Sequence, residues 1–477
     1  MRSPRLPFSS LAIAALLAAP VAGSAEPTLI TAWQGVHAHS AEYAAAVARR
    51  DAGAAARETA RALWLPTLAA QGALAHRSYE SDTTGAQFSA PGFGTSTGVD
   101  FRTSVNGGNA RQWAFIAQQP LFDAARVADS QAASARSRLA EAQFQQIEQA
   151  LMVRTAETLA AVVESGARWR AVQRQRDAAM RARDLAHERY EAGDLPVTEW
   201  REAQAQADQL AVLELDAQQA FAIANEAFAN LTGLAPPIAP TEGGSSQRPV
   251  TTGASELRGS LAPVASWLQR ARDQSPLLAI HSQRQALAEA ELRRWSRIDG
   301  FQLSLVGQYG RETLTGTGDY GDAGATQRLA TIGLQFTVPL FTGGLRSAQR
   351  HAAESSLRAA RADLEGAQQD VDLQVRSAWL AASNARARLQ ATVRAQESAD
   401  SRLDATRIGH EAGDRTLLDL LAAEGAALNA EAGAAAARCE GLLATLRLAA
   451  ATGALDETAL KEAANGEFSC GYGPGNE

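Results

Sequence analysis

Apolar side chains recur every three to four residues through two very long stretches of the chain, residues 123–191 and 345–411. Phe144, Ile147 and Leu151 show this spacing in the first stretch, which places them on one face of an α-helix. A continuous helix over residues 123–191 would be about 100 Å long, too long to fold inside a compact domain. The pattern therefore predicts rods or the wall of a tube.

Shorter segments before each long stretch alternate between apolar and polar side chains, as strands with one apolar face do. A transmembrane β-strand needs about ten residues with one apolar face. A soluble amphipathic sheet would show the same alternation, but we favour the membrane interpretation. The side chains that we expect to face lipid are Trp113, Phe115, Phe301, Leu303, Leu305, Ile332, Leu334 and Phe336.

The chain contains an internal duplication. Residues 190–194 (YEAGD) recur as residues 410–414 (HEAGD), and the Pro-Leu-Phe at 120–122 recurs at 339–341. A Pro/Gly/Ser/Thr-rich stretch between the two copies is typical of a linker. We therefore expect a signal peptide at 1–25, a first structural repeat at 26–234, a linker at 235–260, a second repeat at 261–455 and a C-terminal tail at 456–477.

Each repeat has the same expected order of elements. A helix of about 35 residues (32–65 and 265–298) is followed by a strand, a Gly-rich exposed loop (78–111 and 311–327) and a second strand. The long helical stretch follows, then a Gly-Asp turn and a returning helix that ends at Gly233 or Gly453, each a plausible C-cap.

Four strands in one chain cannot close a barrel, because the smallest known bacterial barrels have eight. An open sheet edge is not tolerated in lipid. The strands must therefore contribute to a barrel shared between chains. Two chains would supply eight strands and three would supply twelve, and the strand count alone does not choose between them.

The N-terminus has the pattern of a secretory signal. Arg2 and Arg5 precede a short apolar run at 11–19, and Gly23 and Ala25 provide small residues for cleavage after Ala25. Exported proteins can form disulfides, so Cys439 and Cys470 could pair, although a chance pair of cysteines fits equally well. The mature chain shows no apolar run of eighteen residues, the length that an inner-membrane helix needs.

Composition narrows the function. Hydrophobic residues make up 46% of the chain but aromatic residues only 6%, which favours closely packed alanine-rich helices over a large globular core. A formal net charge of −7 argues against nucleic acid as a partner. His187-Glu188 lacks the second histidine of a zinc-protease helix, and no nucleotide fingerprint is present. We therefore expect no enzyme activity, no catalytic residues, no cofactor and no metal site.

The segment at 413–421 (GDRTLLDLL), its counterpart at 193–199 (GDLPVTE) and the Pro-Leu-Phe-Thr-Gly-Gly at 339–344 resemble the TolC family of outer-membrane efflux and secretion channels. The resemblance covers nearly the whole mature chain. It implies a homotrimer in the cell outer membrane, with a shared 12-stranded transmembrane β-barrel continued by a long α-helical barrel in the periplasm. It also implies a periplasmic adaptor and an inner-membrane pump as partners, and the second turn is most similar to members that serve type I secretion.

The resemblance further implies that the Gly-Asp turns form the periplasmic tips, where polar links keep the entrance closed and the adaptor makes contact. Asp419 stands where the family can place an acidic ring. The implied gate and contact residues are Gly193, Asp194, Thr198, Glu199, His410, Gly413, Asp414, Arg415 and Asp419. A Glu199–Arg415 pair is chemically sensible, although these charges would also simply solvate helix ends. The alternative function is a soluble periplasmic helical-hairpin adaptor, and the cargo is left open.

Overall fold

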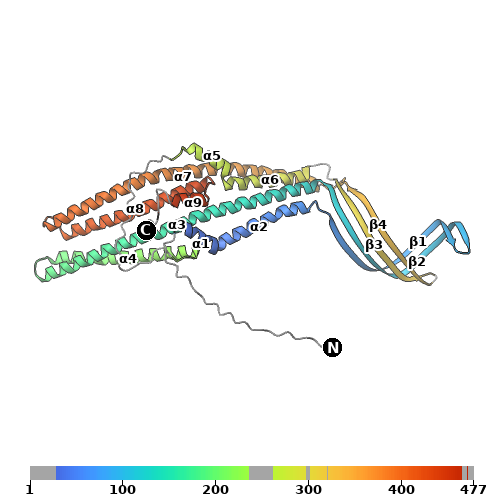
Figure 1. Ribbon diagram of the computed structural model, residues 1–477, viewed down its shortest axis with the longest axis horizontal. Coiled ribbons are helices and arrows are strands. Elements are labelled where there is room, and N and C mark those ends of the chain that lie inside the picture. The colour runs from blue at the N-terminus through green and yellow to red at the C-terminus, as the bar shows by residue number, and fades with distance from the viewer. Residues whose placement is uncertain (1–27, 236–260, 297–300, 320, 465–469, 471–477) are drawn as a thin grey trace, which may run out of the picture.

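Two antiparallel helical hairpins form one end of the molecule, and a sheet of long strands forms the other (Figure 1). This computed structural model describes residues 28–235, 261–296, 301–319, 321–464 and 470. The expected signal peptide at 1–25 and nearly all of the expected linker at 235–260 lie outside the described residues. None of the helices in the described part of the chain is long and apolar enough to cross a membrane.

The two longest helices, α3 (Ala124–Glu191) and α7 (Leu345–Glu411), run the whole length of the helical part. Asp123 begins α3 by accepting hydrogen bonds from the backbone N–H groups of Ala125 and Arg126, a typical N-cap. The returning helices are α4 (Val197–Thr232) and α8 (Leu417–Ala451). Gly233 follows α4 with a φ of +68° and Gly453 follows α8 with a φ of +76°, a conformation that favours glycine.

Each helix expected at about 35 residues is instead a pair of helices. The first pair is α1 (Leu29–His39) and α2 (Ala41–Ala62), and the second is α5 (Val264–Gln274) and α6 (Pro276–Ser296). Ser40 breaks the first pair, because its backbone is extended and its side chain accepts a hydrogen bond from the Tyr43 N–H. Ser275 is extended in the second pair because Pro276 follows it. The expectation of continuous helices was wrong at both places.

The helices form a wall one layer thick. Next to the sheet the order across the wall is α2, α3, α6, α7, and next to the hairpin turns it is α4, α3, α8, α7 (Figure 1). In the half near the turns, α4 packs on α3 and α7 packs on α8, so α4 and α7 form the two edges of the wall. Each edge helix therefore has one face that no other described helix of the chain covers.

The main apolar core lies at the middle of the wall, where α1, α3, α4 and α8 meet. Trp33 and Val36 of α1 are fully buried there together with Leu151 of α3, Phe228 of α4 and Leu446 of α8.

A further helix, α9 (Glu457–Ala464), covers this core with the buried side chain of Leu460. The expected tail at 456–477 therefore contains a packed helix, because Leu460 has a place in the core. Cys439 and Cys470 form a disulfide that joins Cys470, which follows α9 in the sequence, to the buried face of α8.

The sheet has four antiparallel strands in chain order: β1 (Thr67–Ala90), β2 (Gly94–Asp123), β3 (Gln302–Gly318) and β4 (Gly321–Thr337). The Gly-rich loops expected at 78–111 and 311–327 are mostly strand, and this expectation was wrong. Backbone ladders continue through these segments. Glycine allows local irregularities within these strands. Gly85, for example, has a φ of +68° and lies at a register shift between Thr83 and Ala86.

Strand register places the expected apolar side chains on one face. Phe115 is opposite Tyr309, Leu305 is opposite Leu334 and Leu303 is opposite Phe336. Directly opposed residues point to the same side of a sheet. The other face is polar where Gln118 donates a hydrogen bond to Ser304 (3.2 Å). The exposed fractions on the apolar face reach 79% for Ile332, 67% for Leu334 and 71% for Phe336.

Candidate functional site

The two hairpin turns lie together at the end of the molecule opposite the sheet (Figure 1). In the first turn the Asp194 N–H donates to the Arg189 carbonyl (2.9 Å), and the Gly193 N–H donates to the Tyr190 carbonyl (3.0 Å). This pair of bonds needs a left-handed residue, and Gly193 has a φ of +82°. Pro196 then begins α4.

The second turn repeats this backbone arrangement. The Asp414 N–H donates to the Gly409 carbonyl (2.8 Å), the Gly413 N–H donates to the His410 carbonyl (3.0 Å), and Gly413 has a φ of +83°. Gly193, Asp194, Gly413 and Asp414 therefore shape the two tips through their backbones. The two turns have the same backbone conformation because the sequence Glu-Ala-Gly-Asp occurs in both.

Arg415 is held against the end of α7. His410 Nδ1 lies 3.0 Å from the Arg415 carbonyl oxygen. A Cβ atom at Gly409 would come within 2.9 Å of the Arg415 Cγ atom. Gly409 therefore leaves the space in which the Arg415 side chain lies, and in the first repeat Arg189 occupies the corresponding position.

Asp419 belongs to a capping box at the start of α8. Its carboxylate accepts hydrogen bonds from the Thr416 N–H (3.1 Å) and hydroxyl (3.0 Å), and its own N–H donates to the Thr416 hydroxyl oxygen (3.1 Å). These bonds from Thr416 hold the pKa of Asp419 below its ordinary value, and the charges of Arg415 and Arg402 lower it further. Within one chain, Asp419 therefore has a clear local role in forming the helix end.

The first tip carries an aromatic stack that the sequence analysis did not identify. Trp200 stacks on His187 (5.0 Å between ring centroids) and on Tyr190 (5.4 Å), and the Arg201 guanidinium lies 4.3 Å from the Trp200 ring centroid. His187 and Tyr190 are three residues apart on α3, so both can reach Trp200 across the turn. In the sequence, the spacing of these residues around the Gly-Asp turn could have indicated the stack.

The structure does not join the two tips within one chain. Among the described residues it gives no ion pair between Glu199 and Arg415, which belong to different hairpins. Thr198 and Glu199 lie exposed in the first turn of α4. A Glu199–Arg415 link therefore needs either a movement of the hairpins or a second copy of the chain.

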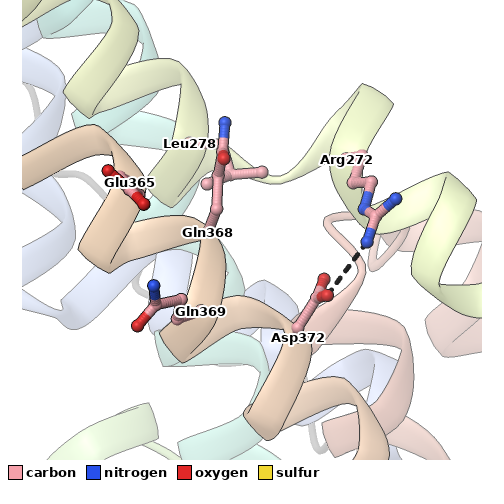
Figure 2. Close-up of a pocket in the computed structure, with 6 residues that line it drawn as sticks. All are labelled: Arg272, Leu278, Glu365, Gln368, Gln369 and Asp372. Atoms are coloured by element: carbon pink, nitrogen blue, oxygen red, sulfur yellow. Dashed lines mark hydrogen bonds and ion pairs between the residues drawn. The ribbon is translucent and has the colours of Figure 1, made fainter. Parts of the chain in front are cut away.

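A separate open groove of about 490 Å³ lies between α5, α6 and α7, next to the middle of the wall. Arg272 and Asp372 form an ion pair (3.0 Å) on one side of it, and Gln369 points away from that pair (Figure 2). Leu278, Glu365 and Gln368 complete the lining. No group of three or more His, Cys, Asp or Glu side chains in the described ranges could hold a metal ion.

Comparisons with known proteins agree with this architecture. The chain matches the family described as "Outer membrane efflux protein" over residues 34–234 and 267–454, which are the two repeats. It is 27% identical to the outer membrane protein TolC of Vibrio cholerae over 353 residues, which is 71% of this chain and 76% of that protein. It is 26% identical to the alkaline protease secretion protein AprF of Pseudomonas aeruginosa over 347 residues, 72% of this chain and 70% of that protein.

Solved structures share the fold. The CmeC outer membrane channel of Campylobacter jejuni superposes with a TM-score of 0.67 at 15% identity, covering 97% of this chain and 98% of that one. VceC of Vibrio cholerae gives a TM-score of 0.64 at 20% identity, covering 89% and 96%. The family match and the sequence relatives support the channel hypothesis and not the soluble adaptor alternative. Since the family match covers well over half of the sequence, the chain belongs to the outer membrane efflux protein family.

Proposed function

We propose that this protein forms the exit duct of a multi-component export system in the outer membrane. The observation that carries the proposal is that the sheet and the helical wall of one chain both have open edges. The sheet ends at β1 and β4, and the wall near the tips ends at α4 and α7. In a chain of the outer membrane efflux protein family, a sheet and a helical wall with open edges are the parts of a segment of a closed tube.

Three copies are the assembly that we propose. Three chains supply twelve strands, which close one barrel and leave no edge in the membrane. The same ring joins the helical walls into one tube continuous with the barrel. The apolar sheet face that carries Trp113, Phe115, Leu334 and Phe336 then contacts lipid, and the Gln118–Ser304 face lines the lumen.

The tips form the closed end of the duct. Arg415 and Glu199 are placed at helix ends where neighbouring hairpins can link them, and His410 fixes the backbone beside Arg415. One exposed ion pair contributes only about 0–1 kcal/mol, so closure depends on several links acting together. An adaptor protein connected to an inner-membrane pump contacts these tips and opens them.

The pump, rather than this chain, determines which cargo is exported. AprF is named as an alkaline protease secretion protein and BepC of Brucella suis as an outer membrane efflux protein. A passive duct of this family therefore suits secretion of an unfolded protein as well as efflux of small molecules. The type I secretion role is our more specific proposal, because it rests on the form of the second tip, Arg415-Thr416 followed by Asp419.

Conductance in planar lipid bilayers tests the channel function. Protein extracted from the outer membrane is added to one side, and we expect discrete, low-conductance steps from a duct that is closed at its tips. Protein denatured before addition is the control. Native protein that inserts without any conductance steps, even after charge substitutions at the tips, would contradict a channel function.

A further inference from the structure

Three arginines gather on the apolar face of the sheet, at the end of the apolar region that is farther from the helices (Figure 1). Arg311 lies directly opposite Trp113 of β2 and Arg328 of β4, so all three side chains point to the same side of the sheet. Arg111 is two residues beyond Trp113 along β2 and lies opposite Thr313. We call Arg111, Arg311 and Arg328, which are all exposed, the arginine cluster.

The arginine cluster lies at the limit of the apolar face. Toward the helices, the next row across the sheet contains Phe115 and Tyr309, and the apolar side chains continue to Leu303. Arg311 is eight residues after Leu303, a length of about 27 Å along a strand. Transmembrane strands tilt by about 40°, so this segment covers about 21 Å of an apolar band that is about 25 Å high. The cluster therefore lies where the headgroups of the outer leaflet begin.

In the described part of the sheet, no acidic side chain lies beside the arginine cluster on its own face. Glu312 points to the polar face, where it pairs with Arg77. Asp322 is six residues from Arg328 along β4, a distance of about 20 Å. The acidic residues farther out on β1 pair with Arg102. Within the described ranges, none of the three cluster arginines forms an ion pair.

These positive charges are unfavourable on this face unless an anion joins them. Like charges that lie directly opposite each other destabilise a sheet, and Arg311 faces Arg328 in this way. Arginine on the lipid-facing side of a barrel also costs free energy, and this cost becomes small only near the interfaces. A phosphate group would offset both costs, because guanidinium groups bind phosphate oxygens through paired N–H···O hydrogen bonds.

We propose that the arginine cluster binds phosphate groups on the headgroup of an outer-leaflet lipid. This proposal rests on the proposed function, because it assumes that the apolar face lies in the membrane. The acyl chains of the lipid cover Trp113 and Phe115, and its phosphate oxygens accept hydrogen bonds from Arg311 and Arg328. A phosphorylated glycolipid suits this surface, because one molecule supplies both the apolar chains and the negative charge.

Lipid binding by the detergent-extracted protein tests the arginine cluster. Native mass spectrometry counts the bound molecules of lipid A, a glycolipid with two phosphates, as its concentration is raised. We expect saturable binding to the unsubstituted protein and about tenfold weaker binding to Arg311→Gln/Arg328→Gln, which loses the hydrogen bonds to phosphate. Arg311→Lys/Arg328→Lys keeps the charge and should keep most of the binding. The matched control is Arg102→Gln, outside the cluster in the same sheet, and it should bind lipid A as the unsubstituted protein does.

Two further comparisons identify the ligand. Lipid A from which both phosphates have been removed should bind the unsubstituted protein about tenfold more weakly, since charge-assisted hydrogen bonds to phosphate are lost. Inorganic phosphate at the concentration of the lipid should not displace lipid A. Equal binding of the two lipids would show that the apolar face alone holds them and would overturn the proposal. Displacement by inorganic phosphate would overturn the assignment of the anion to a lipid.

The same variants separate this proposal from the proposed function. The arginine cluster is remote from the tips (Figure 1), so Arg311→Gln/Arg328→Gln should still fractionate with the outer membrane and give unchanged conductance steps. If that variant binds lipid A as tightly as Arg102→Gln does, the lipid site is overturned and the duct is not. Unsubstituted protein that fractionates without the outer membrane would overturn the proposed function and the lipid site together.

Discussion

The Nδ1 atom of His410 lies 3.0 Å from the backbone carbonyl oxygen of Arg415, across the turn that joins α7 to α8. A carbonyl oxygen only accepts hydrogen bonds, so Nδ1 carries the proton in this contact. In the first tip Tyr190 stands at the corresponding position and stacks on Trp200. The two tips therefore share a backbone shape and differ in side chains, so a ring of three chains would present two kinds of tip in alternation.

Replacing Arg415 by alanine should weaken closure of the duct. The side chain lies over Gly409 at the tip, and in the proposed trimer its loss would remove one link from each chain. With about 0–1 kcal/mol for each link, we expect a several-fold increase in mean conductance in planar bilayers. Arg407→Ala is a matched control, because Arg407 lies one to two turns from the tip and pairs with Asp404 of its own helix. Equal conductance in the Arg415 variant and the unsubstituted protein would contradict the gating role.

Thr416→Ala should destabilise the second tip. It removes the hydroxyl that receives the Asp419 N–H and that donates to the Asp419 carboxylate. Loss of such a cap costs about 1 kcal/mol, so we expect faster hydrogen exchange in the first turn of α8. Thr416→Ser retains the hydroxyl and should exchange at the original rate. If both variants exchange equally, the capping box does not stabilise this helix end.

Lowering the pH should also destabilise the first turn of α8, as Thr416→Ala does. Because the folded-state pKa of Asp419 is lowered, its contribution to stability is present above the ordinary carboxyl pKa and is lost as pH falls through the folded-state value.

The disulfide should help to hold α9 on the wall. Lys461, on α9, is the single lysine of the chain and lies between the bonded cysteines. The bonded cysteines are 31 residues apart, and closing such a loop stabilises the fold by about 3–4 kcal/mol in the chain-entropy relation. We expect a lysine-specific protease to cut Cys470→Ser much faster than the unsubstituted protein. Equal rates of cleavage would show that α9 is held by Leu460 and its neighbours without the disulfide.

Glu164→Gln should stabilise the protein at neutral pH. Burial, and then the charge of Glu440, raise the pKa of Glu164 in the folded state. A raised carboxyl pKa contributes stability that is present below the unfolded pKa and is lost as pH rises through the folded value. The variant should therefore have a higher melting temperature at pH 7, and the difference should disappear near pH 4. Glu188→Gln, at an exposed position of the same helix, should change the melting temperature little at either pH.

Much of the helical wall could be predicted from the sequence, because its signals are local and repeated. The apolar spacing around Phe144 and Leu151 indicates a helix, and the Pro-Leu-Phe at 120–122 places its start within one residue of the observed start at Ala124. Gly193 and Gly413 identify the turns. The helix breaks at Ser275 and Ser40 were also visible in principle, since Pro276 follows Ser275 and serine is a favoured N-cap residue.

The long strands could not be predicted, because their outer halves have no apolar pattern. Residues such as Thr83 and Thr103 are held by backbone pairing between β1 and β2, and the glycines in these strands resemble loop glycines in sequence. The aromatic stack around Trp200 and the position of Arg415 over Gly409 also required coordinates. Each depends on contacts across a turn between residues that share no periodic pattern.

The most direct test of the proposed duct is the native mass of the full-length protein extracted with detergent from the outer-membrane fraction, measured after subtraction of the bound detergent. We expect three chains per particle, because twelve strands close the barrel and a ring of three chains leaves neither α4 nor α7 uncovered. A monomer that fractionates without the outer membrane would contradict both the shared barrel and the proposed duct.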